Sequence, residues 1–259
     1  MIYVSVVSHG HFEIISKLNS LPALASDEQI KVCVKDNLSS HEMRTYCAAH
    51  KIDYVVTNKS QGFGENNNLI YHFYSEEITD DDYFVILNPD VYVDPTTLKL
   101  AINNMQDRDV KLATINLFRD QDYTVYDNSV RSFPKLKDFI KSYFFKKNTT
   151  IVKKEEIHSP TFVDWAAGSM LIFKSGLYKR LHGFNEMYFM YCEDIDICWR
   201  AKQYFSERVL YLPHLRGVHH AQFSNRRFLS KHFIWHVKSI IIFLSYKYGV
   251  ISKVKSTLV

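Results

Sequence analysis

The sequence predicts an α/β fold built on a doubly wound, mainly parallel sheet. Short apolar segments typical of strands alternate with segments of about 10–15 residues that have helical spacing. One strand, Phe84–Leu87, is apolar at every position, as central strands of parallel sheets are. The chain has 259 residues, of which 46% are hydrophobic, so it is long enough to form the core of one large domain.

The elements are assigned from local patterns in chain order. The first half has strand patterns at residues 2–8, 29–35, 52–57, 83–88 and 110–116. Helix patterns lie between them at 11–21, 40–50 and 65–77, and from Pro95 onward, where proline favours the first turn. The alternation lapses at 118–160, which we interpret as an insertion. Regular patterns return at 162–165. They continue with a strand at 169–174, a short helix to Leu181, a helix at 194–204 and a strand at 208–212.

The strand at 84–87 ends abruptly in Asn88-Pro89-Asp90. Pro89 cannot continue a β-ladder, so the strand stops and leaves Asp90 at its carboxyl end, where open α/β sheets bind ligands. Mg²⁺ usually binds one or two carboxylates together with phosphate oxygens, so Asp90 could hold a divalent cation on a phosphorylated substrate. A turn in which Asp90 caps the next helix would explain the same residues.

Two other segments are expected near the same sheet edge. Asp36 follows the second strand and could accept hydrogen bonds from a nucleotide base or ribose, although a helix-capping Asx turn is an equal alternative. The glycine-bearing loop at 62–68 opens a helix and could approach a pyrophosphate. It is not a GxGxxG motif and lacks the GK[ST] of a P-loop, so it indicates neither a Rossmann dinucleotide site nor a P-loop kinase.

The stretch at 189–200 carries the strongest chemical signal. Apolar residues at 195, 198 and 199 mark the buried face of a helix. Glu193, Asp194 and Asp196 fall in its first turn, where the helix dipole stabilises anions by roughly 0.3–1 kcal/mol each. Three acids in four positions exceed what capping needs, so we expect a carboxylate that takes a proton from an attacking hydroxyl.

His219 and His220 follow the last predicted strand. A histidine can complete a metal site with carboxylates from elsewhere in the chain. A histidine pair of this kind also occurs as a hydrogen-bonded core or surface feature.

The positive charge of the chain is concentrated in its tail. Residues 223–259 contain seven Lys or Arg and no Asp or Glu, whereas the whole chain carries a net charge of only +4. Aromatic and aliphatic residues are interspersed, so this basic amphipathic helical tail could lie in a membrane interface, where each Lys or Arg contributes about 1 kcal/mol. A helix packed on the core with a solvated basic face is the alternative. We find no apolar run near the ~20 residues of a spanning helix and no basic segment of a signal peptide at the N-terminus.

Taken together, these segments resemble the family 2 glycosyltransferases of the GT-A fold, and especially bacterial rhamnosyltransferases that build O-antigen or cell-wall polysaccharide on a lipid carrier. The resemblance runs from Val4 to about His236. It is carried by an ordered series of motifs: VVSHGH at 6–11, DN at 36–37, GFGENNN at 62–68, LNPD at 87–90, VDWAAGS at 163–169, GFNE at 183–186 and FMYCEDIDIC at 189–198.

The resemblance implies a domain organisation and a donor site. It places a GT-A domain at 1–222, with a nucleotide-sugar-binding half at 1–117 and an acceptor and catalytic half at 118–222, before a membrane-associating tail at 223–259. The residues implied to contact the donor and the sugar pocket are Ser8, His9, Asp36, Asn67, Asn68, Asn88, Trp165 and Gly168.

The resemblance also implies the metal and the base. Asp90 and His219 would hold Mg²⁺ or Mn²⁺, Asp194 would be the general base, and Glu193 is the second candidate. The family's DxD motif is not complete, because its first acid is replaced by Asn88. The chemistry fits these residue types, since a metal neutralises a departing diphosphate and one base without an enzyme nucleophile gives inversion through an oxocarbenium-like transition state.

The implied activity is an inverting, metal-dependent transfer of L-rhamnose from dTDP-L-rhamnose to a polyprenyl-diphosphate-linked sugar in O-antigen or lipopolysaccharide biosynthesis. The expected location is the cytoplasm, peripheral on the inner face of the bacterial inner membrane, with no nucleic-acid partner. One alternative is a family 2 enzyme with another donor, such as a UDP-hexose. Others are a non-catalytic nucleic-acid binder that uses the basic aromatic tail, and a degenerate enzyme retained as an assembly partner.

Overall fold

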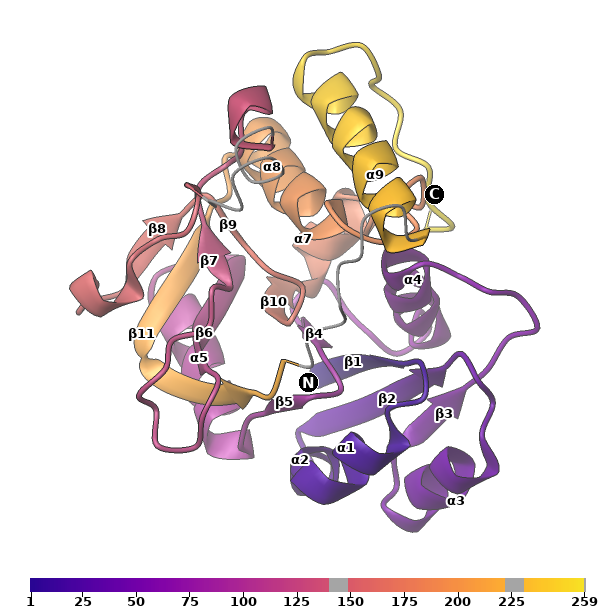
Figure 1. Cartoon of the computed structure of the whole chain (residues 1–259). Helices are drawn as coiled ribbons and strands as arrows, with labels where there is room; N and C mark the ends of the chain where they lie inside the picture. Colours follow the sequence, from indigo (N-terminus) through magenta and orange to yellow (C-terminus); the bar gives the residue numbers. More distant parts are fainter. Residues whose placement is uncertain (140–148, 222–230, 259) are drawn as a thin grey trace.

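The computed structural model describes residues 1–139, 149–221 and 231–258 (Figure 1). In this part of the chain a nine-stranded sheet has the order β3-β2-β1-β4-β10-β6-β11-β5, with β8 paired to β11, and β7 pairs with β9 in a separate small sheet. The strands are β1 (Ile2–Ser8), β2 (Ile30–Asp36), β3 (Asp53–Val55), β4 (Tyr83–Leu87), β5 (Val91–Tyr92), β6 (Leu112–Phe118), β7 (Val130–Arg131), β8 (Thr161–Val163), β9 (Trp165–Ala166), β10 (Met170–Lys174) and β11 (Val209–His219).

Helices cover both faces of the large sheet. The helices are α1 (Phe12–Leu18), α2 (Ser20–Ala25), α3 (His41–Ala49), α4 (Phe63–Phe73), α5 (Pro95–Asp107), α7 (Ser175–Arg180), α8 (Glu193–Phe205), α9 (Lys231–Lys247) and the 3-10 helix η1 (Lys154–Glu156). One core contains residues of α1, α2, α3 and α5, and the other contains residues of α4, α7, α8 and α9.

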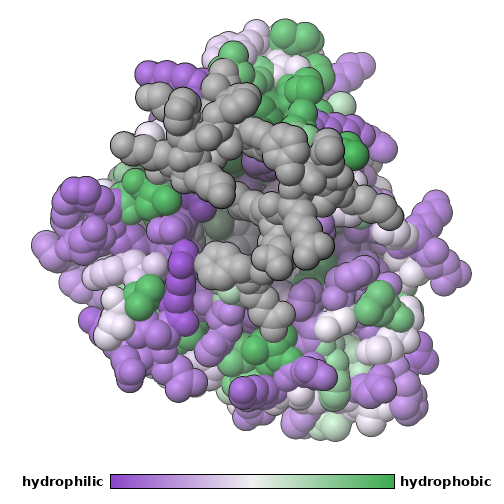
Figure 2. All heavy atoms as spheres, in the orientation of Figure 1, coloured by the Kyte–Doolittle hydropathy of each residue, from purple (hydrophilic) through white to green (hydrophobic). Residues whose placement is uncertain are grey.

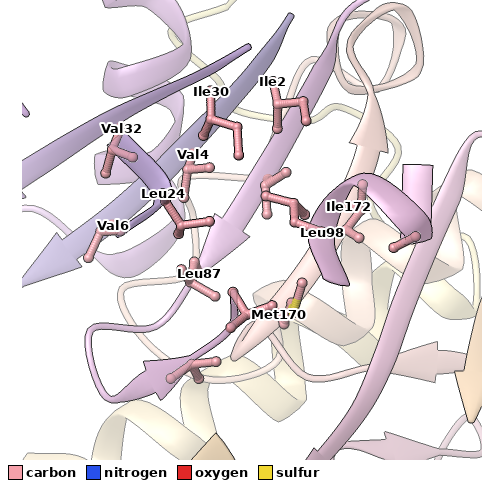
Figure 3. Packing of buried hydrophobic residues seen from close by; sticks show 14 of the residues in the cluster. Ile2, Val4, Val6, Leu24, Ile30, Val32, Leu87, Leu98, Met170 and Ile172 are labelled. Carbon is pink, nitrogen blue, oxygen red and sulfur yellow. The ribbon is translucent and has the colours of Figure 1, made fainter. Parts of the chain in front are cut away.

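The two cores follow from the alternation of side chains along each strand. Val85 and Leu87 of β4 belong to the first core, whereas Phe84 and Ile86 belong to the second. Figure 3 shows the first core, in which Leu87 lies near Met170. A strand that is apolar at every position therefore contributes to both layers. The pairing of β2, β1 and β4 is parallel, as is that of β6 with β11, which confirms the predicted doubly wound, mainly parallel sheet.

The strand β10 runs antiparallel to both of its neighbours, β4 and β6. Met170 pairs with Leu87, so the start of β10 lies beside the end of β4. This arrangement brings the segment just before β10 to the carboxyl ends of the parallel strands, where ligands bind in such sheets.

Two helix predictions are wrong in their bounds. The helix expected at 11–21 is two helices, because Asn19 adopts a left-handed conformation with φ 53° and ends α1. Pro22 lies inside α2, in the first turn, where a backbone N–H has no helical partner to lose. The helix expected at 65–77 is α4, which begins at Phe63 and ends at Phe73.

The strand expected at 208–212 is also longer than predicted. β11 continues past Pro213 with an irregular register between Leu212 and Arg216 and ends at His219. Its last residues pair with β5, a two-residue strand that the sequence did not predict, and His219 lies opposite Val91. The extension carries His219 to the Asn88-Pro89-Asp90 turn.

The helix α9 packs on the second core. Ile242, Phe243 and Tyr246 are buried in it, and the Ser239 hydroxyl donates a hydrogen bond of 2.8 Å to the Met190 carbonyl. In the described residues, none of the helices has the length and apolar character needed to cross a bilayer. The predicted boundary between 222 and 223 lies outside the described residues.

Candidate active site

Asp90, His219 and Asp127 form a nearly buried triad at the carboxyl end of β4. His219 Nε2 lies 3.3 Å from Asp90 Oδ1, and His219 Nδ1 lies 3.1 Å from Asp127 Oδ2. The His220 backbone N–H donates a hydrogen bond of 3.0 Å to the Asp90 carbonyl, which ties the end of β11 to the turn after β4. The structure thus brings together the two predicted metal ligands and adds a second carboxylate.

The charges of the triad stabilise one another. Burial lowers the pKa of His219, but its hydrogen bonds to Asp127 and Asp90 and their negative charges outweigh burial and raise the pKa to about 9. Burial raises the pKa of each carboxyl, yet the hydrogen bond and charge of His219 lower the pKa values of Asp90 and Asp127 overall. Without a metal, His219 is therefore a cation held between two anions at neutral pH.

The Asp90–His219 pair has the spacing of two neighbouring metal ligands. Two ligands bound about 2.1 Å from an octahedral ion, 90° apart, are separated by about 3 Å. In the part of the chain that the structure describes, no three His, Cys, Asp or Glu side chains converge on one point, because Asp127 lies at the other ring nitrogen of His219. Two protein ligands fit a Mg²⁺-like ion that takes its other ligands from water and phosphate.

The predicted base lies at the start of α8. The helix follows Tyr191 and Cys192, which are both left-handed, with φ of 73° and 65°. Asp194 accepts hydrogen bonds from the backbone N–H groups of Gly168, at 3.2 Å, and Ile195, at 2.9 Å. Burial raises the pKa of Asp194 although these hydrogen bonds lower it, so this carboxylate can accept a proton more readily than an exposed one.

Glu193, the second candidate base, is more buried, with 7% of its surface exposed. Its Oε2 atom has no hydrogen-bond partner among the described residues. Burial, with a further contribution from the charge of Asp194, raises the pKa of Glu193 well above its usual value. Burial therefore favours the neutral form of Glu193, next to the predicted base.

Gly168 and Ser169 connect the predicted base, Asp194, to the turn that carries the predicted metal ligand Asp90. Gly168 donates to Asp194, and the Ser169 carbonyl accepts a hydrogen bond of 3.0 Å from the Asn88 N–H. A Cβ atom at Gly168 would lie 2.9 Å from the Phe63 ring, so the close approach of these segments requires glycine. The start of α8 thus contacts Gly168, and the Asn88-Pro89-Asp90 turn contacts the next residue, Ser169.

Trp165 and Arg131 lie beside this connection. The Trp165 indole N–H donates a hydrogen bond of 2.9 Å to the Ser132 carbonyl, and the Arg131 guanidinium lies 5.4 Å from the centre of the indole ring. The positive charge of Arg131 is one of the influences that lower the pKa of Asp194. Arg131, which no sequence pattern indicated, therefore lies beside Trp165 and acts through its charge on the predicted base Asp194.

The predicted base-binding residues lie at the ends of β1 and β2. Ser8 pairs with Asp36, and its carbonyl accepts a hydrogen bond of 2.9 Å from the Asn37 N–H. The Asp36 carboxylate accepts hydrogen bonds from the backbone N–H groups of residues 38 and 40 and from the Tyr54 hydroxyl. His9 is exposed. Asp36 thus forms the Asx turn that was the alternative to nucleotide binding. It lies at the carboxyl edge of the sheet, as predicted.

Asn67 and Asn68 are fully buried and use their amides inside the protein. Asn67 accepts a hydrogen bond of 2.6 Å from the Ser5 hydroxyl and donates to the Phe63 carbonyl. Asn68 accepts from the Tyr178 hydroxyl and donates to the Phe184 carbonyl. These amides hold α4 to its neighbours, so a role in donor binding would have to act through the position of α4.

Comparison with known proteins identifies the family. No family model matches the chain. The chain is 40% identical over 251 residues to the rhamnosyltransferase WbbL of Escherichia coli (strain K12), a match that covers 95% of this chain and 94% of WbbL. The chain belongs to the family 2 glycosyltransferases of the GT-A fold. This glycosyltransferase is also 28% identical over 239 residues to the N-acetylglucosaminyl-diphospho-decaprenol L-rhamnosyltransferase of Mycobacterium tuberculosis (strain ATCC 25618 / H37Rv), covering 86% of this chain and 77% of that one.

Solved structures support the fold of the glycosyltransferase. GalNAc-T7, whose crystal structure contains UDP, GalNAc and Mn²⁺, aligns with a TM-score of 0.64 and 11% identity. The alignment covers 96% of this chain and 49% of GalNAc-T7, so the chain spans about half the length of that protein. At this level of identity the likeness shows the GT-A fold.

Proposed function

We propose that this glycosyltransferase transfers L-rhamnose from dTDP-L-rhamnose to a polyprenyl-diphosphate-linked sugar in O-antigen or lipopolysaccharide biosynthesis, with inversion. The 40% identity to WbbL and the name of the mycobacterial relative support this donor and acceptor class. The observation that carries the proposal is the link through Gly168 and Ser169, which joins the base Asp194 to the turn that bears Asp90.

The donor occupies the carboxyl ends of β1, β2 and β4 in this proposal. Asp36, with Ser8 and His9, lies beside the nucleotide base, and Tyr54 holds the Asp36 carboxylate in place. Asp90 and His219 hold Mg²⁺ or Mn²⁺, which when bound neutralises the charge of the departing diphosphate. Asn88 orients the turn through its contact with Ser169.

Asp194 accepts the proton of the acceptor hydroxyl as the hydroxyl attacks the sugar. Its raised pKa brings the carboxylate closer to the operating pH, which improves a general base. Because no enzyme nucleophile takes part, the acceptor oxygen forms its bond to the sugar carbon while the bond from that carbon to the diphosphate oxygen breaks, and dTDP leaves. This single displacement inverts the sugar carbon. Trp165 and Gly168 border the pocket where that sugar lies. Glu193 is the second candidate for the base.

The acceptor reaches the base along α9, in our proposal. One side of this helix contacts the loop before α8, where the Phe189 and Trp235 rings are 4.7 Å apart and the Tyr191 hydroxyl lies 3.1 Å from His232 Nδ1. The opposite side exposes two apolar residues, Ile234 and Ile241, with Lys238 between them. The exposed Tyr248 follows the end of the helix.

Figure 2 shows apolar surface at the top of the molecule, over the part that α9 occupies in Figure 1. Exposed apolar side chains with basic neighbours and no acid suit the interface of an anionic membrane. We therefore propose a peripheral location on the inner face of the inner membrane, where the lipid end of the acceptor stays in the bilayer and its sugar meets Asp194.

The test is a transfer assay with purified protein and an N-acetylglucosaminyl-diphospho-polyprenol acceptor in anionic vesicles. The donors are dTDP-L-rhamnose, UDP-glucose and GDP-mannose, each with Mn²⁺ or Mg²⁺ and with EDTA. We expect a rhamnosylated lipid of inverted configuration from dTDP-L-rhamnose alone, and no product with EDTA. Transfer from UDP-glucose as fast as or faster than from dTDP-L-rhamnose would show that the proposed donor is wrong. Full activity in EDTA would show that transfer does not need the proposed metal.

A further inference from the structure

We infer that Asp127 is the positioning residue that fixes His219 as a metal ligand in the glycosyl transfer site. The inference rests on the proposed function, in which His219 holds the metal with Asp90. Asp127 lies between β6 and β7, in the stretch that the sequence marks only as an irregular insertion. No feature of the sequence connects it to the site.

The geometry separates the roles of the two carboxylates. Asp127 Oδ2 lies 3.1 Å from His219 Nδ1, and Asp90 Oδ1 lies 3.3 Å from Nε2. The two nitrogens are on opposite edges of the imidazole ring, so Asp127 and a metal bound at Nε2 occupy opposite sides. When a metal replaces the Nε2 proton, Asp127 accepts the Nδ1–H of the neutral ring, and the Nε2 lone pair is then directed at the metal position beside Asp90.

Asp127 is itself held by buried backbone and side-chain contacts. Its N–H donates a hydrogen bond of 3.0 Å to the Leu117 carbonyl in β6. Lys154, which is 2% exposed, donates to the same carbonyl at 3.2 Å and to the Ser129 hydroxyl at 2.9 Å. The Ser129 carbonyl accepts a hydrogen bond of 2.8 Å from Ala167, next to Gly168. Asp127 is therefore fixed to the same framework that carries the base.

A carboxylate behind a ligating histidine sets the tautomer, the ring orientation and the basicity of the ligand. Loss of such a partner typically costs about 10–100-fold in metal affinity. The contribution is large here because the proposed site has two protein ligands among the described residues, so a rotated His219 would leave Asp90 as the one described ligand.

The experiment titrates Mn²⁺ into the full-length protein in the presence of dTDP, with free Mn²⁺ followed by electron paramagnetic resonance. Asp127→Ala removes the carboxylate, and Asp127→Asn keeps its size and removes its charge. Asp122→Asn is the matched control, because Asp122 is an exposed carboxylate in the same connection. Electron spin echo envelope modulation reports whether an imidazole nitrogen is bound to the Mn²⁺, with His219→Ala as the reference for its loss.

We expect Asp127→Ala to weaken Mn²⁺ affinity by about 10–100-fold and to reduce the imidazole signal, while Asp122→Asn leaves both unchanged. Thermal melts show whether each variant is folded. We expect the Mn²⁺ affinity of Asp127→Asn to lie between those of Asp127→Ala and wild type. If Asp127→Ala does not fold, Asp127→Asn provides the test. Mn²⁺ affinity and an imidazole signal equal to those of wild type would overturn the inference. An expected Mn²⁺ result without rhamnosyl transfer would leave the inference standing and reject the proposed donor. If the wild-type protein transfers rhamnose but gives no imidazole signal, the inference is rejected and the proposed donor stands.

Discussion

The carboxylate of Asp194 accepts a hydrogen bond from the backbone N–H of Gly168, with 3.2 Å between Oδ2 and N. Ser169, the next residue, accepts from Asn88. Residues more than 100 positions apart in the sequence are therefore linked by two consecutive peptide units. This relationship brings the start of α8 to the end of β4, and the catalytic predictions depend on it.

Substitution Asp194→Asn removes the proposed base and keeps the shape of the side chain. We expect the rate of transfer at saturating donor and acceptor to fall by about 10²–10⁴-fold, because general base catalysis contributes that much. The measurement is the steady-state rate with dTDP-L-rhamnose, with Glu193→Gln assayed in parallel. A variant Asp194→Asn that keeps the full rate, together with an inactive Glu193→Gln, would move the base to Glu193.

The buried ion pair of Asp196 and Arg200 holds α8 in place. Arg200 Nε lies 2.7 Å from Asp196 Oδ2, and the same guanidinium donates to the Leu181 and Gly183 carbonyls. We expect Asp196→Ala to lower the free energy of unfolding by about 3–5 kcal/mol, because it leaves a buried cation without its anion. Urea denaturation measures this change. The control Asp122→Asn, at an exposed position, is expected to change the free energy by less than about 0.5 kcal/mol.

The triad predicts how stability depends on pH when no metal is bound. The pKa of His219 is raised from its usual 6.5 to about 9 in the folded protein, so protonation favours the native state. This stabilisation is complete below about pH 6.5 and is lost as the pH rises through about 9. We expect the difference in free energy of unfolding between wild type and His219→Gln, measured with a chelator, to shrink from pH 6 to pH 10. A constant difference would show that folding does not raise the pKa of His219.

The exposed side of α9 predicts binding to anionic vesicles. Ile234 and Ile241 are each 60% exposed, so a charged side chain at either position should be tolerated by the fold. We expect Ile241→Glu, and more strongly the double substitution with Ile234→Glu, to reduce co-sedimentation with anionic vesicles. Leu100→Glu, on α5 and 44% exposed, is the control for a general effect of added negative charge. Equal loss of binding in the control, or none in the α9 variants, would contradict the proposed membrane contact.

Much of the fold and part of the site could be predicted from the sequence. The alternation of apolar strands with helices predicted the parallel sheet, which the structure confirms. Pro89 predicted the end of β4, and the acids at 193–196 predicted the first turn of α8. These features depend on backbone chemistry and periodicity within a few residues, so the sequence alone determines them.

Only the tertiary structure decided which distant residues meet. The continuation of β11 past Pro213 places His219 beside Asp90, and the antiparallel β10 brings Gly168 to Asp194. Asp127 gave no local signal, since a carboxylate in an irregular segment is compatible with many surroundings. Strand pairing and burial are long-range properties set by packing of the whole chain, so they determine the triad, its charge state and its partners.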